Sequence, residues 1–178
     1  MANVTKVKVK FSSDLSPDKI LDDATAKLVG ETVKDMMLNL ISKGISPVRG
    51  EGKFKAYAEQ RLNDKTKYPK SVKKKFPGKK TRPVNLSLSG ELLKKFGWWI
   101  SKGARGLGKT TWIGFKNPSK RTKDLLETHN EGRHKDVPKR QILPDFSQNE
   151  ELAVSINRKI VEIYRKRVES IINKANSK

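Results

Sequence analysis

Two long segments with a helical spacing of apolar residues, one near each end of the chain, constrain its fold more than any other feature. The first covers about residues 16–43 and the second about 147–174. Their apolar residues recur every three or four positions, as on one face of an α-helix. We predict two long amphipathic helices, the second lying on a sheet with a basic outer face; a helix lying on a membrane surface is the other interpretation of the second. The apolar positions are Ile20, Leu21, Ala24, Leu28, Val33, Met37, Leu40 and Ile41, then Leu152, Ile156, Ile160, Ile163, Tyr164, Val168, Ile171 and Ile172.

The first helix has recognisable ends. Ser16-Pro17-Asp18 combines an N-cap residue, a proline at the first helical position and an acid in the first turn. Gly44 directly follows the periodic residues and suits a C-terminal stop. Gly30 is expected to weaken the middle of the helix by about 1 kcal/mol. The helix is therefore expected to run unbroken from about 16 to 43.

The region between the two helices contains a predicted β-hairpin. Aromatic and β-branched residues fill 96–101 and 110–116, and the glycine-rich segment 102–109 separates them. Residues 4–11 alternate between valine or phenylalanine and lysine, as a half-buried strand does. The pattern predicts an α+β fold with a small antiparallel sheet, in which the hairpin packs against the two long helices. We expect one domain, 1–178, with short helices near 53–62, 89–93 and 123–128.

The chain is strongly basic. Its 40 Lys and Arg against 19 Asp and Glu give a formal net charge of +21 over 178 residues. Such an excess attracts polyanions, so nucleic acid, an anionic membrane surface or an acidic protein face are the candidate partners. Charge alone does not choose among them.

Many of these basic residues lie in a predicted loop or arm at about 44–83, in which glycine and proline recur. Residues 65–82 hold nine Lys or Arg and no acid, so burial is implausible there. We expect this loop and the tip of the hairpin to contact DNA or an acidic partner. The candidate contact residues are Lys70, Lys73, Lys74, Lys75, Lys79, Lys80, Arg82, Arg105 and Lys109.

Residues 103–110 match the phosphate-binding pattern G-x-x-x-x-G-K-T. A true site of this kind needs a helix directly after the loop, because its N-terminus and backbone N–H groups hold the phosphates. Here Thr111-Trp112-Ile113 favours a strand instead. We therefore interpret the segment as a hairpin tip and not as a nucleotide site.

No other pattern indicates catalysis or a cofactor. His129, Glu131 and His134 are interpreted as loop residues and not as metal ligands, because ordered zinc sites usually use four well-spaced ligands. The chain has no cysteine, which excludes disulfides and thiolate metal sites. No apolar run is long enough to span a bilayer. We expect a soluble protein without enzymatic activity, made in a cytoplasm.

Four short motifs, in this order, resemble those of phage virion-morphogenesis and tail-completion proteins. Residues 84–93 resemble an apolar–Ser/Thr–Gly–x–Leu step that contains Gly90 and Leu92, and 112–115 resemble a strand that ends in an apolar–Gly–apolar step. His129 to Gly132 resemble a His–polar–x–Gly turn. Residues 137–144 resemble a Pro–x–Arg–x–apolar–Leu element with Pro138 and Arg140, and a helix closes the pattern.

The resemblance implies a small α+β subunit of a homo-oligomeric ring at the phage head–tail junction, where it would meet other head, neck and tail proteins. It implies a location in the virion, with assembly in the host cytoplasm, and no catalysis or cofactor. The His129–Gly132 turn and the element from Pro138 to Leu143 would shape a loop and the approach to the last helix. Arg140 would reach an acidic group on a neighbour, or be an ordinary exposed arginine. The alternative function is a stand-alone basic nucleic-acid-binding protein.

Overall fold

The computed structural model describes residues 16–55, 91–103, 108–132 and 138–177. The predicted strand at 4–11, the basic loop at 65–82 and most of the expected helix at 53–62 lie outside these residues. The elements in chain order are α1 (Pro17–Ile20), α2 (Asp23–Ser42), α5 (Glu91–Lys94), β1 (Gly97–Lys102), β2 (Lys109–Gly114), α6 (Lys120–Glu131), a short 3-10 helix (Phe146–Gln148) and α7 (Val154–Asn176).

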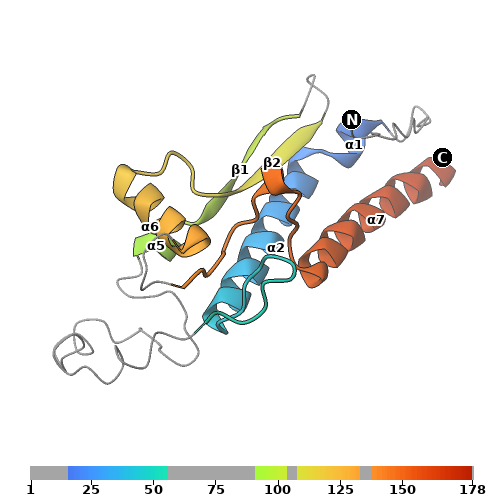
Figure 1. Ribbon diagram of the computed structural model, residues 1–178. Coiled ribbons are helices and arrows are strands. Elements are labelled where there is room, and N and C mark those ends of the chain that lie inside the picture. The colour runs from blue at the N-terminus through green and yellow to red at the C-terminus, as the bar shows by residue number, and fades with distance from the viewer. Residues whose placement is uncertain (1–15, 56–90, 104–107, 133–137, 178) are drawn as a thin grey trace, which may run out of the picture.

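The described elements form the predicted α+β fold around α2. Figure 1 shows α2 behind the hairpin of β1 and β2, with α7 running beside it. Helix α2 contacts both strands and α7, and therefore joins the sheet to the C-terminal helix. The core contains Val29, Val33, Met37 and Ile41 of α2 together with Leu92, Phe96, Phe115, Ile142, Ile156 and Ile163 from later elements.

The predicted first helix is two helices. The chain leaves the helical conformation at Leu21, whose ψ is 46°. Asp22 then starts α2 as its N-cap, and its Oδ1 accepts a hydrogen bond of 2.8 Å from the backbone N of Thr25. An aspartate side chain that satisfies a free N–H in this way favours a new helix start over continuation of the old one.

Arg167 of α7 fixes this break. Its guanidinium donates to Asp22 Oδ2 at 2.5 Å and to the backbone oxygen of Lys19 at 3.0 Å. Partial burial opposes ionisation of Asp22, but the hydrogen bonds from Thr25 and the charge of Arg167 together hold its pKa below the ordinary value. The start of α2 and the second half of α7 are thereby held together.

Helix α2 ends as predicted, just before Gly44. This glycine has a φ of 73°, which the left-handed region allows without steric cost. The backbone N of Ile45 donates to Leu40 O at 2.9 Å, and that of Gly44 donates to Ile41 O at 2.9 Å. This pair of bonds is the Schellman arrangement.

The predicted hairpin is confirmed. Strands β1 and β2 are antiparallel, with Trp98 opposite Ile113 and Trp99 opposite Trp112. Because side chains alternate across a strand, the first pair faces α2 and the second faces outward. The outward Trp99 and Trp112 stack with ring centroids 6.3 Å apart.

The loop that was expected to leave the fold at about residue 44 stays on it through residue 55. Ser46 and Val48 are both 3% exposed. Ser46 Oγ donates to Gln141 O at 2.6 Å, and Arg49 N donates to Glu151 O at 2.8 Å. The sequence boundary of about 44 was therefore too early, because contacts with later segments hold these residues.

Two further boundaries differ from the sequence prediction. Helix α6 is longer than the expected helix at 123–128, because Ser119 caps it and accepts a hydrogen bond of 3.3 Å from Thr122 N. Helix α7 begins at Val154 and not near 147, since the 3-10 helix and Asn149, with a φ of 57°, come before it.

Candidate partner-binding surfaces

The structure brings two of the motif residues together. His129 lies in the last turn of α6, and its backbone oxygen accepts a hydrogen bond of 2.6 Å from Arg140 N. Leu92 is buried in the core at 6% exposure. Gly90 lies outside the described residues. The motifs from α6 onward therefore meet in space and hold the fold together.

The expectation that Arg140 is exposed, or reaches a neighbouring chain, is wrong. Arg140 is 1% exposed, and its Nε donates to the backbone oxygen of Lys55 at 3.1 Å. A charged group at this depth needs compensating partners, so its position is set by the fold. Arg140 ties the segment that follows Pro138 to the end of the 44–55 loop.

The expected turn from His129 to Gly132 is the C-terminal end of α6. His129 to Glu131 are helical, and Gly132 follows with a φ of 67° as the left-handed cap. Burial lowers the pKa of His129 from 6.5 to about 4, and the charge of Arg140 adds to this shift. His129 is therefore neutral at physiological pH and belongs to the interior.

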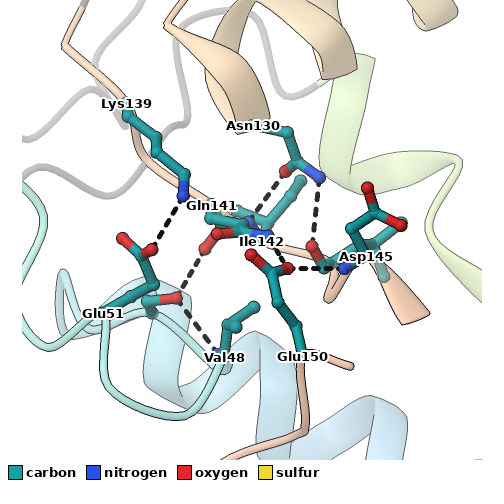
Figure 2. Close-up of polar contacts among 10 residues, drawn as sticks. Val48, Glu51, Asn130, Lys139, Gln141, Ile142, Asp145 and Glu150 are labelled. Carbon is teal, nitrogen blue, oxygen red and sulfur yellow. Dashed lines mark hydrogen bonds and ion pairs between the residues drawn. The ribbon is translucent and has the colours of Figure 1, made fainter. Parts of the chain in front are cut away.

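A polar junction fixes the segment after Arg140 on both sides, as Figure 2 shows. The Asn130 amide accepts from Ile142 N at 2.9 Å and donates to Leu143 O at 3.1 Å. The Glu150 carboxylate accepts from Asp145 N at 2.6 Å and from the Gln141 side chain. These bonds hold residues 141–145 against α6 and Glu150. The sequence resemblance had implied only that the element from Pro138 to Leu143 shapes the approach to the last helix.

An ion pair holds the start of this segment, at Lys139, to the 44–55 loop. Lys139 Nζ lies 2.8 Å from Glu51 Oε1, and this contact raises the pKa of Lys139. The polar groups of the junction thus bind one another, which suits a structural role. Among the residues that the structure describes, no group of His, Asp and Glu is arranged to hold a metal ion.

The hairpin tip is held against α1 and α2. Gly108 N donates to Asp18 Oδ1 at 2.5 Å, and Lys109 Nζ lies 3.2 Å from Asp23 Oδ1. Lys109 was expected to contact a partner, but an acid of its own chain pairs with it. Arg105 lies outside the described residues, as do the candidate lysines of the basic loop.

The outer face of the hairpin exposes aromatic surface. Trp112 is 51% exposed, and its Nε1 donates to Ser101 Oγ at 2.8 Å. Trp98 faces α2, but Trp112 and its stacking partner Trp99 lie on the opposite face of the sheet.

Each long helix also presents a stripe to solvent, and these stripes include residues that the apolar spacing had assigned to the buried faces: Ala24, Leu28, Val168 and Ile172. The stripe on α7 alternates apolar and basic residues, whereas the stripe on α2 combines an apolar residue with acids. Val154, Val161 and Leu28 are 53%, 66% and 51% exposed. The α7 stripe consists of Val154, Arg158, Val161, Arg165, Val168 and Ile172, and the α2 stripe of Ala24, Leu28, Glu31, Asp35 and Asn39.

Comparison with known proteins adds no further constraint. Within the described ranges, no helix is long and apolar enough to cross a membrane. No known protein family, curated protein or solved structure matches this chain.

Proposed function

We propose that this chain is a non-catalytic structural protein of a phage particle, a subunit of a ring at the neck, connector or tail-completion position. The order of four short motifs supports the phage assignment. The observation that supports a ring most directly is the pair of stripes on α7 and α2. The two stripes are different surfaces of one chain. The stripe on α7 is basic and the stripe on α2 is acidic.

The two stripes are complementary in charge and both are partly apolar. Arg158 and Arg165 lie among exposed valines on α7, whereas Glu31 and Asp35 follow Leu28 along α2. Among the described residues, no ion pair involves Glu31, Asp35 or Arg158. Acids without partners are notable in a chain of net charge +21. An acidic stripe and a basic stripe attract each other and disfavour pairing of like stripes.

A contact between two different surfaces of identical chains is a head-to-tail contact. Such contacts close into a ring when the rotation between neighbours permits. Each subunit has a large positive charge, so self-repulsion opposes closure in the isolated protein, most strongly at low ionic strength. We expect a monomer or weak oligomer in dilute solution, and a ring in the particle, where acidic neighbours or DNA neutralise the charge.

Imaging of finished particles tests the proposal. The expected result is symmetric density for this chain at the neck or the upper end of the tail. One copy per particle, or copies scattered over the capsid surface, would overturn the ring.

The second candidate function is nucleic-acid binding, and the stack of the half-buried Trp99 on the exposed Trp112 favours it. Stacked aromatic rings beside basic residues suit single-stranded bases. Native mass measurement together with DNA binding at two salt concentrations separates the two functions. A defined ring with weak DNA binding supports the structural role, whereas a monomer with tight and steeply salt-dependent binding supports the alternative.

A further inference from the structure

An apolar groove of about 520 Å³ lies along β2, on the side away from β1. Val29 and Met37 of α2, both buried in the core, line it together with Ile113 of β2 and Ile160 and Tyr164 of α7. No strand pairs with this edge of β2 among the residues that the structure describes. A groove of this kind combines unpaired backbone groups with an apolar floor, which is what an added β-strand requires.

The two ends of the groove differ. Leu143 lines one end, because its Cδ1 lies 3.6 Å from the place of a Cβ at Gly114, the residue after Ile113. The other end lies at Lys109, beside α1, because Gly108 N donates to Asp18 of α1. Helix α1 also contacts α7, and Figure 1 shows it between the tip of the hairpin and α7. The chain that precedes Ser16 therefore starts at the Lys109 end of the groove.

The residues just before this point have the pattern of a strand with one apolar face. Val7, Val9 and Phe11 alternate with Lys6, Lys8 and Lys10. Val7 to Phe11 is five residues, the same number as line the groove from Lys109 to Ile113. At about 3.3 Å per residue, the two segments have the same length.

We propose that the N-terminal segment of the same chain fills this groove as a third strand, antiparallel to β2. The antiparallel direction follows from how the segment joins α1. A strand that leads into α1 must end near Lys109, whereas β2 starts at Lys109 and runs in the opposite direction. Val7, Val9 and Phe11 face Met37, Ile160 and Tyr164 in this arrangement. The three lysines face solvent, where charge discourages pairing with a further chain.

Hydrogen exchange of the β2 amides tests the proposal in the full chain. V7S/V9S removes apolar contacts from the inner face, and K6S/K8S is the matched control on the outer face. We expect V7S/V9S to speed exchange of the β2 amides that point away from β1 by about tenfold or more, and to lower the melting temperature by roughly 5 °C or more. The control is expected to change neither. Equal exchange in the wild type and both variants would overturn the strand.

A cross-linking experiment covers the case in which V7S/V9S does not fold. The chain has no cysteine, so V9C/I160C and K8C/I160C each contain one cysteine pair. A short bismaleimide reagent is expected to link V9C/I160C within one chain and to leave K8C/I160C unlinked, because residue 8 faces the other side. Links between two chains would show that a second copy supplies the strand, and absence of links in V9C/I160C would exclude the strand; either result overturns the proposal. The outcome is independent of the proposed ring, which uses the outer faces of α2 and α7.

Discussion

Gly30 sets how closely α2 can approach the sheet. A Cβ at this position would lie 2.5 Å from Cδ2 of Trp98, inside van der Waals contact. The sequence shows only the cost of a glycine in a helix, which suggests that alanine would be better by about 1 kcal/mol. The packing reverses that sign, because the Trp98 ring lies directly on the helix backbone.

We therefore predict that Gly30→Ala destabilises the protein by about 1–3 kcal/mol, the usual cost of overpacking. Chemical denaturation measures this difference. Gly97→Ala is the matched control, since no atom lies within 4 Å of its added Cβ. A Gly30→Ala variant that is more stable than the wild type would show that the helix and sheet can separate without cost.

His129 makes stability depend on pH in a defined window. Burial and Arg140 lower its pKa from 6.5 to about 4 in the folded chain. Between these values the unfolded state binds the proton and the folded state does not, so stability falls as the pH decreases from 6.5 towards 4. The loss is complete near pH 4 and amounts to about 3 kcal/mol at most.

Unfolding free energies at pH 7 and pH 4.5 check this prediction. His129→Gln is expected to lose less stability over this range than the wild type, whatever its stability at pH 7. His134→Gln measures the contribution of the only other histidine. Equal pH dependence in the wild type and His129→Gln would show that folding does not lower the pKa of His129.

At the scale of elements, the hairpin tip illustrates how a motif depends on its surroundings. The G-x-x-x-x-G-K-T segment leads into β2, as the strand-forming residues predicted, and not into a helix. The Gly108 N–H, which would face a phosphate in a nucleotide site, donates to Asp18 instead. The Asp18 carboxylate therefore occupies the position that a phosphate would have in a nucleotide site.

We predict that ATP with magnesium leaves the melting temperature unchanged, whereas Gly108→Ala lowers it. Gly108 has a φ of 63°, and an added Cβ would lie 2.7 Å from Cβ of Leu21, so about 1 kcal/mol or more of stability is lost. Lys109→Ala is the control, because a half-exposed ion pair contributes at most about 1 kcal/mol. A rise in melting temperature with ATP that Lys109→Ala abolishes would restore the nucleotide interpretation.

Sequence patterns predicted those elements whose signals are local. The spacing of apolar residues found the buried Val33, Met37 and Ile41 of α2 and Ile156 and Ile163 of α7. It also placed Ala24, Leu28 and Ile172 on the buried faces, where the structure exposes them. Runs of β-branched and aromatic residues found the hairpin. The break at Asp22 combines a local cap on Thr25 with a contact to Arg167, which is far away in the chain. The burial of Arg140 depends on contacts with Lys55 and His129. No local pattern carries the contacts of Arg167 and Arg140. Most of the predicted basic contact residues lie outside the described part of the chain.

At the scale of the whole molecule, the proposed ring contact predicts a specific response to charge. R158E/R165E makes the α7 stripe acidic, so that it repels the α2 stripe of the next copy. E31K/D35K makes the α2 stripe basic and has the same consequence. Each variant alone is expected to associate at least about tenfold more weakly than the wild type, because like charges in a contact are unfavourable.

Mixing the two variants separates this contact from a general effect of net charge. The acidic α7 stripe of one variant then meets the basic α2 stripe of the other, and the two wild-type stripes also remain complementary. Sedimentation measurements should show that the equimolar mixture associates as the wild type does, in alternating copies. K116E/K123E changes net charge as R158E/R165E does, but at exposed positions off the stripes. Since it lowers self-repulsion and leaves both stripes intact, it should associate at least as well as the wild type. A mixture that stays dissociated would place the contact between subunits elsewhere on the molecule.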